Sequence, residues 1–187
     1  MDGGAQGEYF EAQDAAWCGM HALNNLLGGT YVTKDACGLA ARRVANELSQ
    51  VGGADQETIS LHLHPGTGWL SIDVINVLGA STLGVHVEVN EHPLALLKDT
   101  DCAAVFLVNC NQQHWTVLQR AHTDGAWVHT NSIITELHLS FHGRRRFPTW
   151  VDLLHLMADL KQYYGDVTLP QVRRASPLCG IKNTNPK

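Results

Sequence analysis

One apolar helical stretch, residues 13–29 with the sequence QDAAWCGMHALNNLLGG, constrains the fold of this chain more than any other segment. Residues 15–27 are apolar or good helix formers, Asp14 precedes them as an N-cap residue, and a pair of glycines ends the run. The leucines that lie on one side at helical spacing are Leu23, Leu26 and Leu27. A helix of this composition is stable when it is buried, so we expect the rest of the domain to be built around it.

Cys18 lies in or near the first turn of this predicted helix. The N-terminus of a helix carries about half a positive charge, which favours the thiolate over the thiol. Gln13 precedes the helix, where its amide can point at the same spot as the Cys18 backbone N–H. A thiolate beside two such donors can attack a carbonyl group and stabilise the resulting oxyanion. A single cysteine on an apolar helix is more often a small buried apolar residue, so its partners elsewhere in the chain decide between the two roles.

The composition is that of one globular domain in a reducing compartment. The chain has 187 residues, of which 44% are hydrophobic, and this is enough for a sizeable core. A formal net charge of -5 argues against nucleic acid as the main partner. The five cysteines show no disulfide-scaffold spacing and the chain starts without a secretory pattern, so we expect free thiols in the cytoplasm or nucleus. No apolar run approaches the ~20 residues of a membrane span. We also expect the protein to be a monomer.

The period of the apolar residues changes from helical to alternating near residue 80. The helices expected beyond the first are 34–49, 71–78, 93–97 and 148–164. The strands expected are 83–89, 103–108, 114–120, 126–130 and 167–169. Helices first and strands later predict an α+β domain, with helices packed on a mainly antiparallel sheet.

Composition also marks segments outside these elements. Residues 1–7 are glycine-rich and are expected to form a flexible N-terminal tail. Residues 171–187 are basic and contain prolines, which indicates a mobile C-terminal tail and leaves 8–170 as the domain. Residues 50–68 are rich in glycine and polar residues, which indicates either an exposed arm or lid, or a long surface loop. Residues 136–147 are expected to be an irregular, basic excursion.

Two later residues supply what a nucleophilic cysteine needs, namely a base and a group that orients the base. His114 begins one predicted strand after a polar turn, and Asn131 follows the next predicted strand. If these strands pair as a hairpin, the two residues lie at the same end of it. Asn131 can then accept the imidazole N–H and fix the tautomer that faces Cys18.

The motifs EAQDAAWCGMHALNNLL, GTGWLSIDVINVLG, QHWTVLQR and HTNSIITE resemble the Josephin family of papain-like cysteine proteases that remove ubiquitin, over roughly residues 8–170. The resemblance implies a papain-like α+β fold and hydrolysis of the bond after the C-terminal glycine of ubiquitin, through a thioester on Cys18. It implies His114 as general base and acid, Asn131 as the orienting residue and Gln13 as the donor to the oxyanion. Ubiquitin or polyubiquitin is the implied partner, and neither a cofactor nor a metal is implied.

Further residues near these motifs have expected roles. Trp17 and Trp115 flank the implied catalytic residues, either as walls of a narrow groove that admits only glycine or as core aromatics. His21 lies one helical turn after Cys18 and also matches the motif, and we expect it behind the catalytic residues rather than as the base. An acidic pocket is expected for the arginines of the ubiquitin C-terminus. The candidates for it are Asp55, Glu57 and Asp73.

The resemblance is weakest in three places. Residues 44–68 are shorter and richer in glycine than the long helical hairpin that many family members carry there. Residues 136–149 and the C-terminal tail match poorly. Linkage preference and gating of the site are therefore left open.

Three other functions compete with proteolysis. Metal binding is suggested by the ligand-like pairs Cys18-x-x-His21 and Cys110-x-x-x-His114, although the pairs lie far apart in the sequence. A ubiquitin-binding module without activity is a second possibility, against which the complete catalytic set argues. The main alternative is a related cysteine hydrolase or acyl-transferase that acts on ubiquitin esters or another modifier, because it passes through the same thioester.

Overall fold

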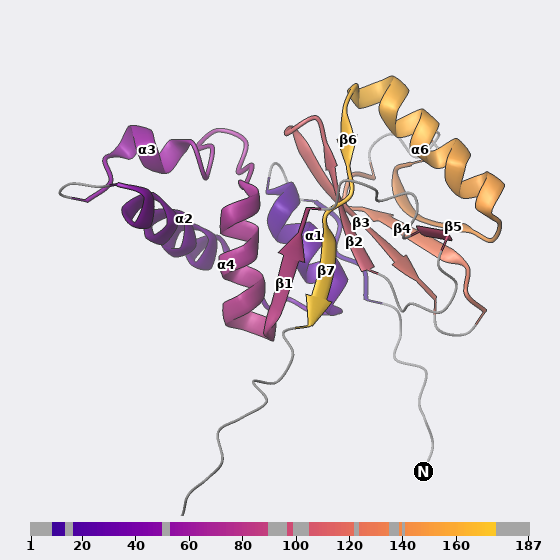
Figure 1. The fold of residues 1–187 in the computed structure, drawn as a ribbon, viewed down its shortest axis with the longest axis horizontal. Helices are drawn as coiled ribbons and strands as arrows, with labels where there is room; N and C mark the ends of the chain where they lie inside the picture. The colour runs from indigo at the N-terminus through magenta and orange to yellow at the C-terminus, as the bar shows by residue number, and fades with distance from the viewer. Residues whose placement is uncertain are drawn as a thin grey trace, which may run out of the picture.

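The computed structural model describes residues 9–13, 17–49, 53–89, 97–98, 105–121, 124–134, 139 and 141–174. In these residues one sheet carries helices on both faces (Figure 1). The helices are α1 (Cys18–Leu27), α2 (Lys34–Leu48), α3 (Gln56–Ser60), α4 (Ile72–Leu83) and α6 (Trp150–Tyr164). The strands are β1 (Val85–Glu88), β2 (Val105–Cys110), β3 (His114–Arg120), β4 (Trp127–Asn131), β5 (Gly143–Phe147), β6 (Val167–Thr168) and β7 (Gln171–Arg174).

The strand order is β1-β7-β2-β3-β4-β5, and β6 pairs with β2 beside this path. Every pair of neighbouring strands is antiparallel. The predicted α+β class, with helices on a mainly antiparallel sheet, is confirmed. Strands β2 and β3 pair from Val105 opposite Gln119 to Cys110 opposite His114, so β2 holds the first residues of β3 in place.

Alternate residues of β2 supply two separate cores, as expected for a strand buried on both faces. Leu107 packs with residues of α1, α2 and α4 on one face of the sheet. Phe106 and Val108 pack with residues of α6 on the other face. The predicted helical stretch around Cys18 does lie in the core, since eight residues of α1, from Cys18 to Asn25, are buried.

Side-chain caps begin four of the described helices, and Asp55 caps α3. The Thr33 hydroxyl accepts the Ala36 N–H at the start of α2, and the Ser71 hydroxyl accepts the Val74 N–H at the start of α4. At the start of α6, Thr149 forms a capping box with Asp152.

Helix α4 passes through Gly79, where the sequence predicts a stop, and ends at Gly84 instead. A Cβ atom on Gly79 would lie 3.1 Å from the Val85 side chain and 3.2 Å from the Val85 carbonyl oxygen. This glycine therefore serves the close approach of β1 to the helix rather than a turn. Gly84 has a φ of 60°, a left-handed conformation that ends helices, so the following strand begins at Val85.

Two segments predicted to be irregular are strands. Residues 143–147 form β5, which pairs with β4 at the edge of the sheet. Residues 171–174 form β7, which lies between β1 and β2, so the prediction of a mobile tail from residue 171 is wrong for these four residues. Neither GRRRF nor QVRR alternates apolar and polar residues, so pairing with distant strands determines their conformation. The predicted tails 1–7 and 175–187 lie outside the described residues, as do Asp14 and most of the predicted helix 93–97.

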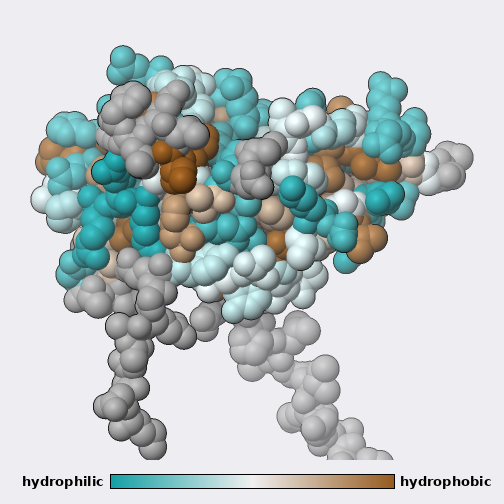
Figure 2. Space-filling model, turned by 180° about the vertical axis from the view of Figure 1, so that it is seen from behind, coloured by the Kyte–Doolittle hydropathy of each residue, from teal (hydrophilic) through white to brown (hydrophobic). Residues whose placement is uncertain are grey.

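Helices α2 and α3 form an arm that projects away from the sheet, at the left of Figure 1. Its residues include exposed Leu39, Leu48 and Leu61, and Figure 2 shows apolar side chains there between hydrophilic ones. The predicted arm at 50–68 contains α3 in its described part, and its role as a lid stays a prediction. None of the described helices combines the length and the apolar character that crossing a bilayer requires.

Candidate active site

The pairing of β3 with β4 brings His114 and Asn131 together, as the sequence predicts. Val117 lies opposite Thr130 in the register, so Asn131 projects from the same face of the sheet as His114. The His114 Nε2 and Asn131 Oδ1 atoms lie 2.8 Å apart, and both side chains are buried. The predicted hydrogen bond between them is therefore present.

Two backbone groups fix the orientation of the Asn131 amide. The Ile133 N–H donates to Asn131 Oδ1 over 3.0 Å, and Asn131 Nδ2 donates to the Phe141 carbonyl over 2.9 Å. Because Oδ1 can only accept, His114 Nε2 must carry the proton in the bond that joins them. The other nitrogen of the neutral imidazole, Nδ1, then keeps its lone pair and can accept a proton.

The Cys18 thiol lies against the first residues of β3, because α1 packs on this strand. Cys18 Sγ is 4.0 Å from the Gln113 carbonyl oxygen, and the Trp115 backbone N–H also interacts with the sulfur. These are the residues directly before and after His114. The structure therefore brings the predicted nucleophile to the strand end that carries the predicted base.

Burial favours the neutral form of both groups in the ligand-free protein. Burial raises the pKa of the Cys18 thiol to about 11, although backbone N–H groups, that of Trp115 foremost, oppose the shift. Burial lowers the pKa of His114 to about 4, although its hydrogen bond to Asn131 opposes that shift. Desolvation therefore opposes the helix charge that favours the thiolate of Cys18, and the thiol needs a base to become a nucleophile.

Helix α1 begins at Cys18 rather than at residue 15 because Trp17 adopts a left-handed conformation, with a φ of 76°. This is uncommon for a bulky residue, and such strain is found most often at functional sites. The Trp17 N–H donates to the Thr67 carbonyl over 3.0 Å, and its ring lies against Gly68, where a Cβ atom would be 2.6 Å from the indole. The loop at residues 67–68 therefore holds the backbone turn that directs Cys18 at β3.

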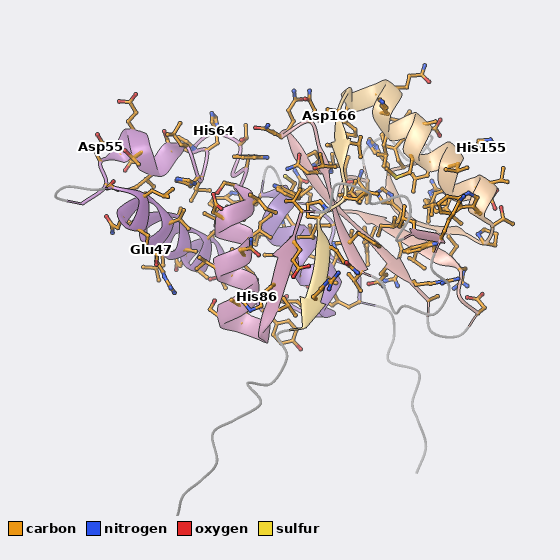
Figure 3. All side chains as sticks on the ribbon, viewed as in Figure 1. Glu47, Asp55, His64, His86, His155 and Asp166 are labelled. Carbon is orange, nitrogen blue, oxygen red and sulfur yellow. The ribbon has the colours of Figure 1, made fainter. Side chains whose placement is uncertain are left out.

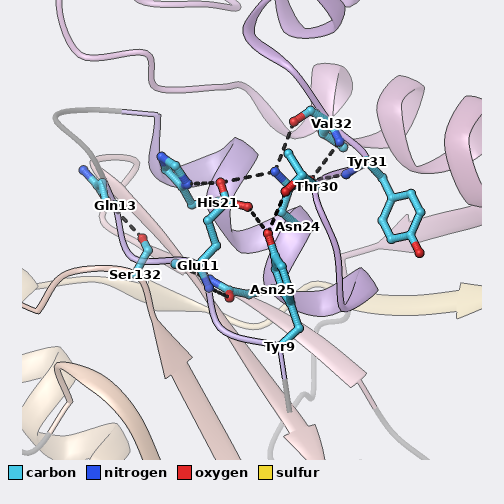
Figure 4. Close-up of polar contacts among 10 residues, drawn as sticks. All are labelled: Tyr9, Glu11, Gln13, His21, Asn24, Asn25, Thr30, Tyr31, Val32 and Ser132. Carbon is cyan, nitrogen blue, oxygen red and sulfur yellow. Dashed lines mark hydrogen bonds and ion pairs between the residues drawn. The ribbon is translucent and has the colours of Figure 1, made fainter. Parts of the chain in front are cut away.

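Ser132, the residue after Asn131, binds Gln13 and holds it next to Asn131. The Gln13 N–H donates to the Ser132 carbonyl over 2.7 Å, and the Ser132 hydroxyl donates to Gln13 Oε1 over 3.1 Å. With Oε1 bound in this way, the amide NH₂ group points away from Ser132 (Figure 4). This serine was not among the residues selected from the sequence, although it belongs to the HTNSIITE motif.

The partly buried carboxylate of Glu11 fixes the segment that carries Gln13 to helix α1 (Figure 4). Glu11 accepts hydrogen bonds from His21 Nδ1 at 2.5 Å, from the Tyr9 hydroxyl at 2.5 Å and from Asn24 Nδ2 at 3.3 Å. The Glu11 backbone is also bound on both sides by the Asn25 side chain. His21 thus lies behind the site, with one nitrogen bound to Glu11.

A pocket of about 330 Å³ adjoins the turn that precedes His114. Trp69, Ile72 and Trp115 are among its lining residues, together with Asn111 and Asp166. Trp115 is only 1% exposed, and its Nε1 donates to the Leu70 carbonyl, so this indole is a core residue at the pocket floor. Trp17 is half-buried and lies at the start of α1, with the Lys34 ammonium 5.5 Å from its ring centre.

The acidic candidates occupy different places. Asp55 caps α3 at the outer end of the arm, far from Asp166 beside β6 (Figure 3), and Glu57 is exposed on the same short helix. Asp73 lies in the first turn of α4, directly after the pocket residue Ile72. Asp166 lines the pocket itself and has no sequence signal, because it comes between α6 and β6.

The ligand-like pairs of the metal alternative do not form a group. Within the described ranges, no cluster of three or more histidine, cysteine or acidic residues has the geometry to hold a metal ion. His114 and His21 are instead bound to Asn131 and Glu11, respectively.

Comparison with known families adds an independent observation. The model of the Josephin family matches residues 13–141, which include Gln13, Cys18, His114 and Asn131. A comparison with curated proteins finds no match. Since the family model covers more than half of the 187 residues, the chain belongs to the Josephin family, which is known for deubiquitinase activity.

Proposed function

We propose that this protein is a thiol-dependent deubiquitinase that cleaves the bond after the C-terminal glycine of ubiquitin. The observation that carries the proposal is the meeting of Cys18 with the start of β3, where Asn131 fixes the proton of His114 on Nε2. Membership of the Josephin family supports ubiquitin as the substrate.

The reaction begins from the neutral pair. His114 Nδ1 takes the proton of the Cys18 thiol as the sulfur attacks the carbonyl carbon of the C-terminal glycine of ubiquitin. The negative charge moves to the carbonyl oxygen, where the Gln13 amide and the Cys18 backbone N–H donate hydrogen bonds to it. Proton transfer during attack suits a thiol whose pKa of about 11 keeps it protonated until substrate arrives.

The tetrahedral intermediate then collapses. Its carbon–nitrogen bond breaks, the leaving amine receives the proton from His114, and a thioester remains on Cys18. A water molecule attacks this thioester while His114 Nδ1 takes a proton from the water. His114 then gives this proton to the sulfur of Cys18, which leaves as the thiol. Free ubiquitin, the amine and the neutral pair are the products, so the cycle needs neither a cofactor nor a metal.

The pocket beside the turn before His114 supports binding of the ubiquitin C-terminus, in which arginines precede the glycine pair. Asp166 lines this pocket, and Asp73 lies directly after its residue Ile72. Carboxylates at these positions suit arginine side chains, with which they form charge-assisted hydrogen bonds. We therefore assign the arginine contacts to Asp73 and Asp166 in preference to Asp55 and Glu57.

Turnover of ubiquitin conjugates tests the proposal. The purified protein is incubated with isopeptide-linked diubiquitin, with a ubiquitin ester of threonine and with the corresponding ester of a different ubiquitin-like modifier, and Cys18→Ala serves as the control. We expect cleavage of diubiquitin that depends on Cys18. Cleavage of the esters alone would replace the proposal with the related hydrolase, and ubiquitin binding without any turnover would replace it with a binding module.

A further inference from the structure

Tyr164, the last residue of α6, covers the His114 imidazole. The two rings are stacked, with centroids 5.8 Å apart and 19° between their planes. The Tyr164 hydroxyl also interacts with the Asn131 side chain. One aromatic side chain from α6 thus contacts both members of the pair that joins β3 to β4.

An aromatic cluster supports Tyr164 in this position. The Phe141 ring lies 5.8 Å from the Tyr164 ring, and the Tyr163 ring meets it edge-on at 4.8 Å. The Phe141 carbonyl accepts the hydrogen bond from Asn131 Nδ2. The same residue therefore anchors the orienting amide and packs against the tyrosine that covers it.

A ring in this place has two physical consequences for His114. It restricts rotation of the imidazole about its side-chain bonds, because the stacked faces must remain in contact. It also keeps water from the hydrogen bond with Asn131, and a hydrogen bond is stronger where the local dielectric constant is low.

We propose that Tyr164 is a positioning residue, whose ring holds the His114 imidazole in place and shields its hydrogen bond to Asn131 from water. His114 Nδ1 thereby remains the basic nitrogen and keeps its direction. The effect on turnover rests on the proposed deubiquitinase function, whereas the shielding is a property of the free protein.

The chain offers a matched control in the neighbouring residue. Tyr163 belongs to the same helical turn and is 54% exposed, and its ring contacts in the described part of the chain are with Phe141, His142 and Tyr164. Tyr163→Leu and Tyr164→Leu both remove a ring from the aromatic cluster. Only the second removes the stack on His114. Tyr164→Phe keeps that stack and removes only the hydroxyl.

The first readout is the His114 ring N–H signal in NMR spectra, which needs no substrate. We expect a slowly exchanging signal in the wild-type protein, in Tyr164→Phe and in Tyr163→Leu, and fast exchange in Tyr164→Leu. Fast exchange in the wild-type protein would overturn the proposal without any variant. Slow exchange in folded Tyr164→Leu would overturn it as well.

The second readout is the pH dependence of kcat/KM on a ubiquitin substrate. The titratable groups that interact with His114 or lie next to it include His129, His142, Cys18, Tyr164 and Cys110, which is opposite His114 on β2. Removing the Tyr164 ring hydrates His114, so we expect the acidic limb to move to higher pH and kcat/KM to fall by about 10- to 100-fold. Tyr163→Leu keeps the stack on His114, so it should change both much less than Tyr164→Leu.

The two readouts separate this proposal from the proposed function. If the wild-type protein does not hydrolyse ubiquitin conjugates but its His114 N–H exchanges slowly, the proposed function is refuted. The proposed role of Tyr164 is then still supported. If the wild-type protein is active, and Tyr164→Leu and Tyr163→Leu give the same pH profile and the same kcat/KM, the proposed role of Tyr164 is refuted. The proposed function is then still supported.

Discussion

The two sides of the active site are held by different kinds of structure. On the sheet side, His114 and Asn131 are 17 residues apart and meet through one pair of neighbouring strands. On the helix side, Gln13 depends on Ser132, which is 119 residues away in the sequence, and the turn before Cys18 depends on the loop at 67–68. The sheet side is therefore set by strand register, and the helix side by contacts between distant segments.

This difference predicts what a substitution does on each side of the active site. Register is shared by many backbone hydrogen bonds, so a single side-chain change on the sheet side should remove chemistry without moving the backbone. The segment with Gln13 is held mainly by side-chain contacts of a few residues, among them Glu11 and Ser132. A change at those residues should displace a catalytic group that is itself unaltered.

The largest effect is expected on the sheet side. His114→Ala should lower kcat by about 10²- to 10⁴-fold, because general acid–base catalysis is lost. The thermal unfolding midpoint should stay close to that of the wild-type protein, since strand register does not depend on this side chain. His155→Ala on the exposed surface of α6 (Figure 3) is the control and should leave kcat unchanged.

On the helix side, Gln13→Ala should lower kcat by about 10²- to 10³-fold with little change in KM, because one donor to the oxyanion is lost. Ser132→Ala keeps the amide and removes the hydroxyl that orients it. It should lower kcat by less than Gln13→Ala, and the double variant should be no slower than Gln13→Ala alone. Additive losses in steady-state assays would contradict a role of Ser132 through Gln13.

Loss of the Glu11 carboxylate should affect stability and turnover together. Glu11→Gln leaves His21 without its anionic partner, so we expect the free energy of unfolding in urea to fall by about 1–3 kcal/mol. The looser segment should also lower kcat through Gln13. The control is Glu47→Gln, which breaks an exposed ion pair with Arg43 and should change stability by less than about 1 kcal/mol. Equal effects of the two variants would show that Glu11 has no special role.

Acid should weaken the sheet side through its buried histidines. Burial lowers the pKa of His129 to about 3 and that of His114 to about 4, below the ordinary value of 6.5. The unfolded chain therefore binds more protons, so stability is fully present above pH 6.5 and is lost as the pH falls toward these values. Thermal unfolding midpoints should decrease from pH 7 to pH 5, and the decrease should be smaller in His129→Gln. A midpoint independent of pH in this range would contradict the assignment.

The same contrast explains what the sequence could predict. The pairing of His114 with Asn131 follows from two neighbouring predicted strands and a short turn between them, which are local signals. The burial of α1 follows from its composition. The position of Gln13 against Ser132 does not follow from local signals, because it depends on a contact across nearly the whole domain.

Other features escaped the sequence for related reasons. The pKa of Cys18 depends on burial by the assembled domain, which outweighs the local helix charge. Asp166 lies in a connection without periodicity, and Tyr164 fits the pattern of an amphipathic helix although its ring contacts His114. The strand at 171–174 is determined by its pairing with β1 on one side and with β2 on the other. Tertiary packing decides each of these.

The central claim is that Cys18 is the nucleophile among the described buried cysteines, because it lies at the start of α1 and against the start of β3, where the Trp115 backbone N–H and the oriented His114 are placed. Ubiquitin with a C-terminal electrophile, followed by mass spectrometry of the adduct, tests this most directly, since Cys37 and Cys110 are buried thiols in the same protein. We predict one ubiquitin per molecule, attached to Cys18, with labelling slowed in His114→Ala. Attachment to another cysteine, or no adduct at all with folded protein, would contradict the account.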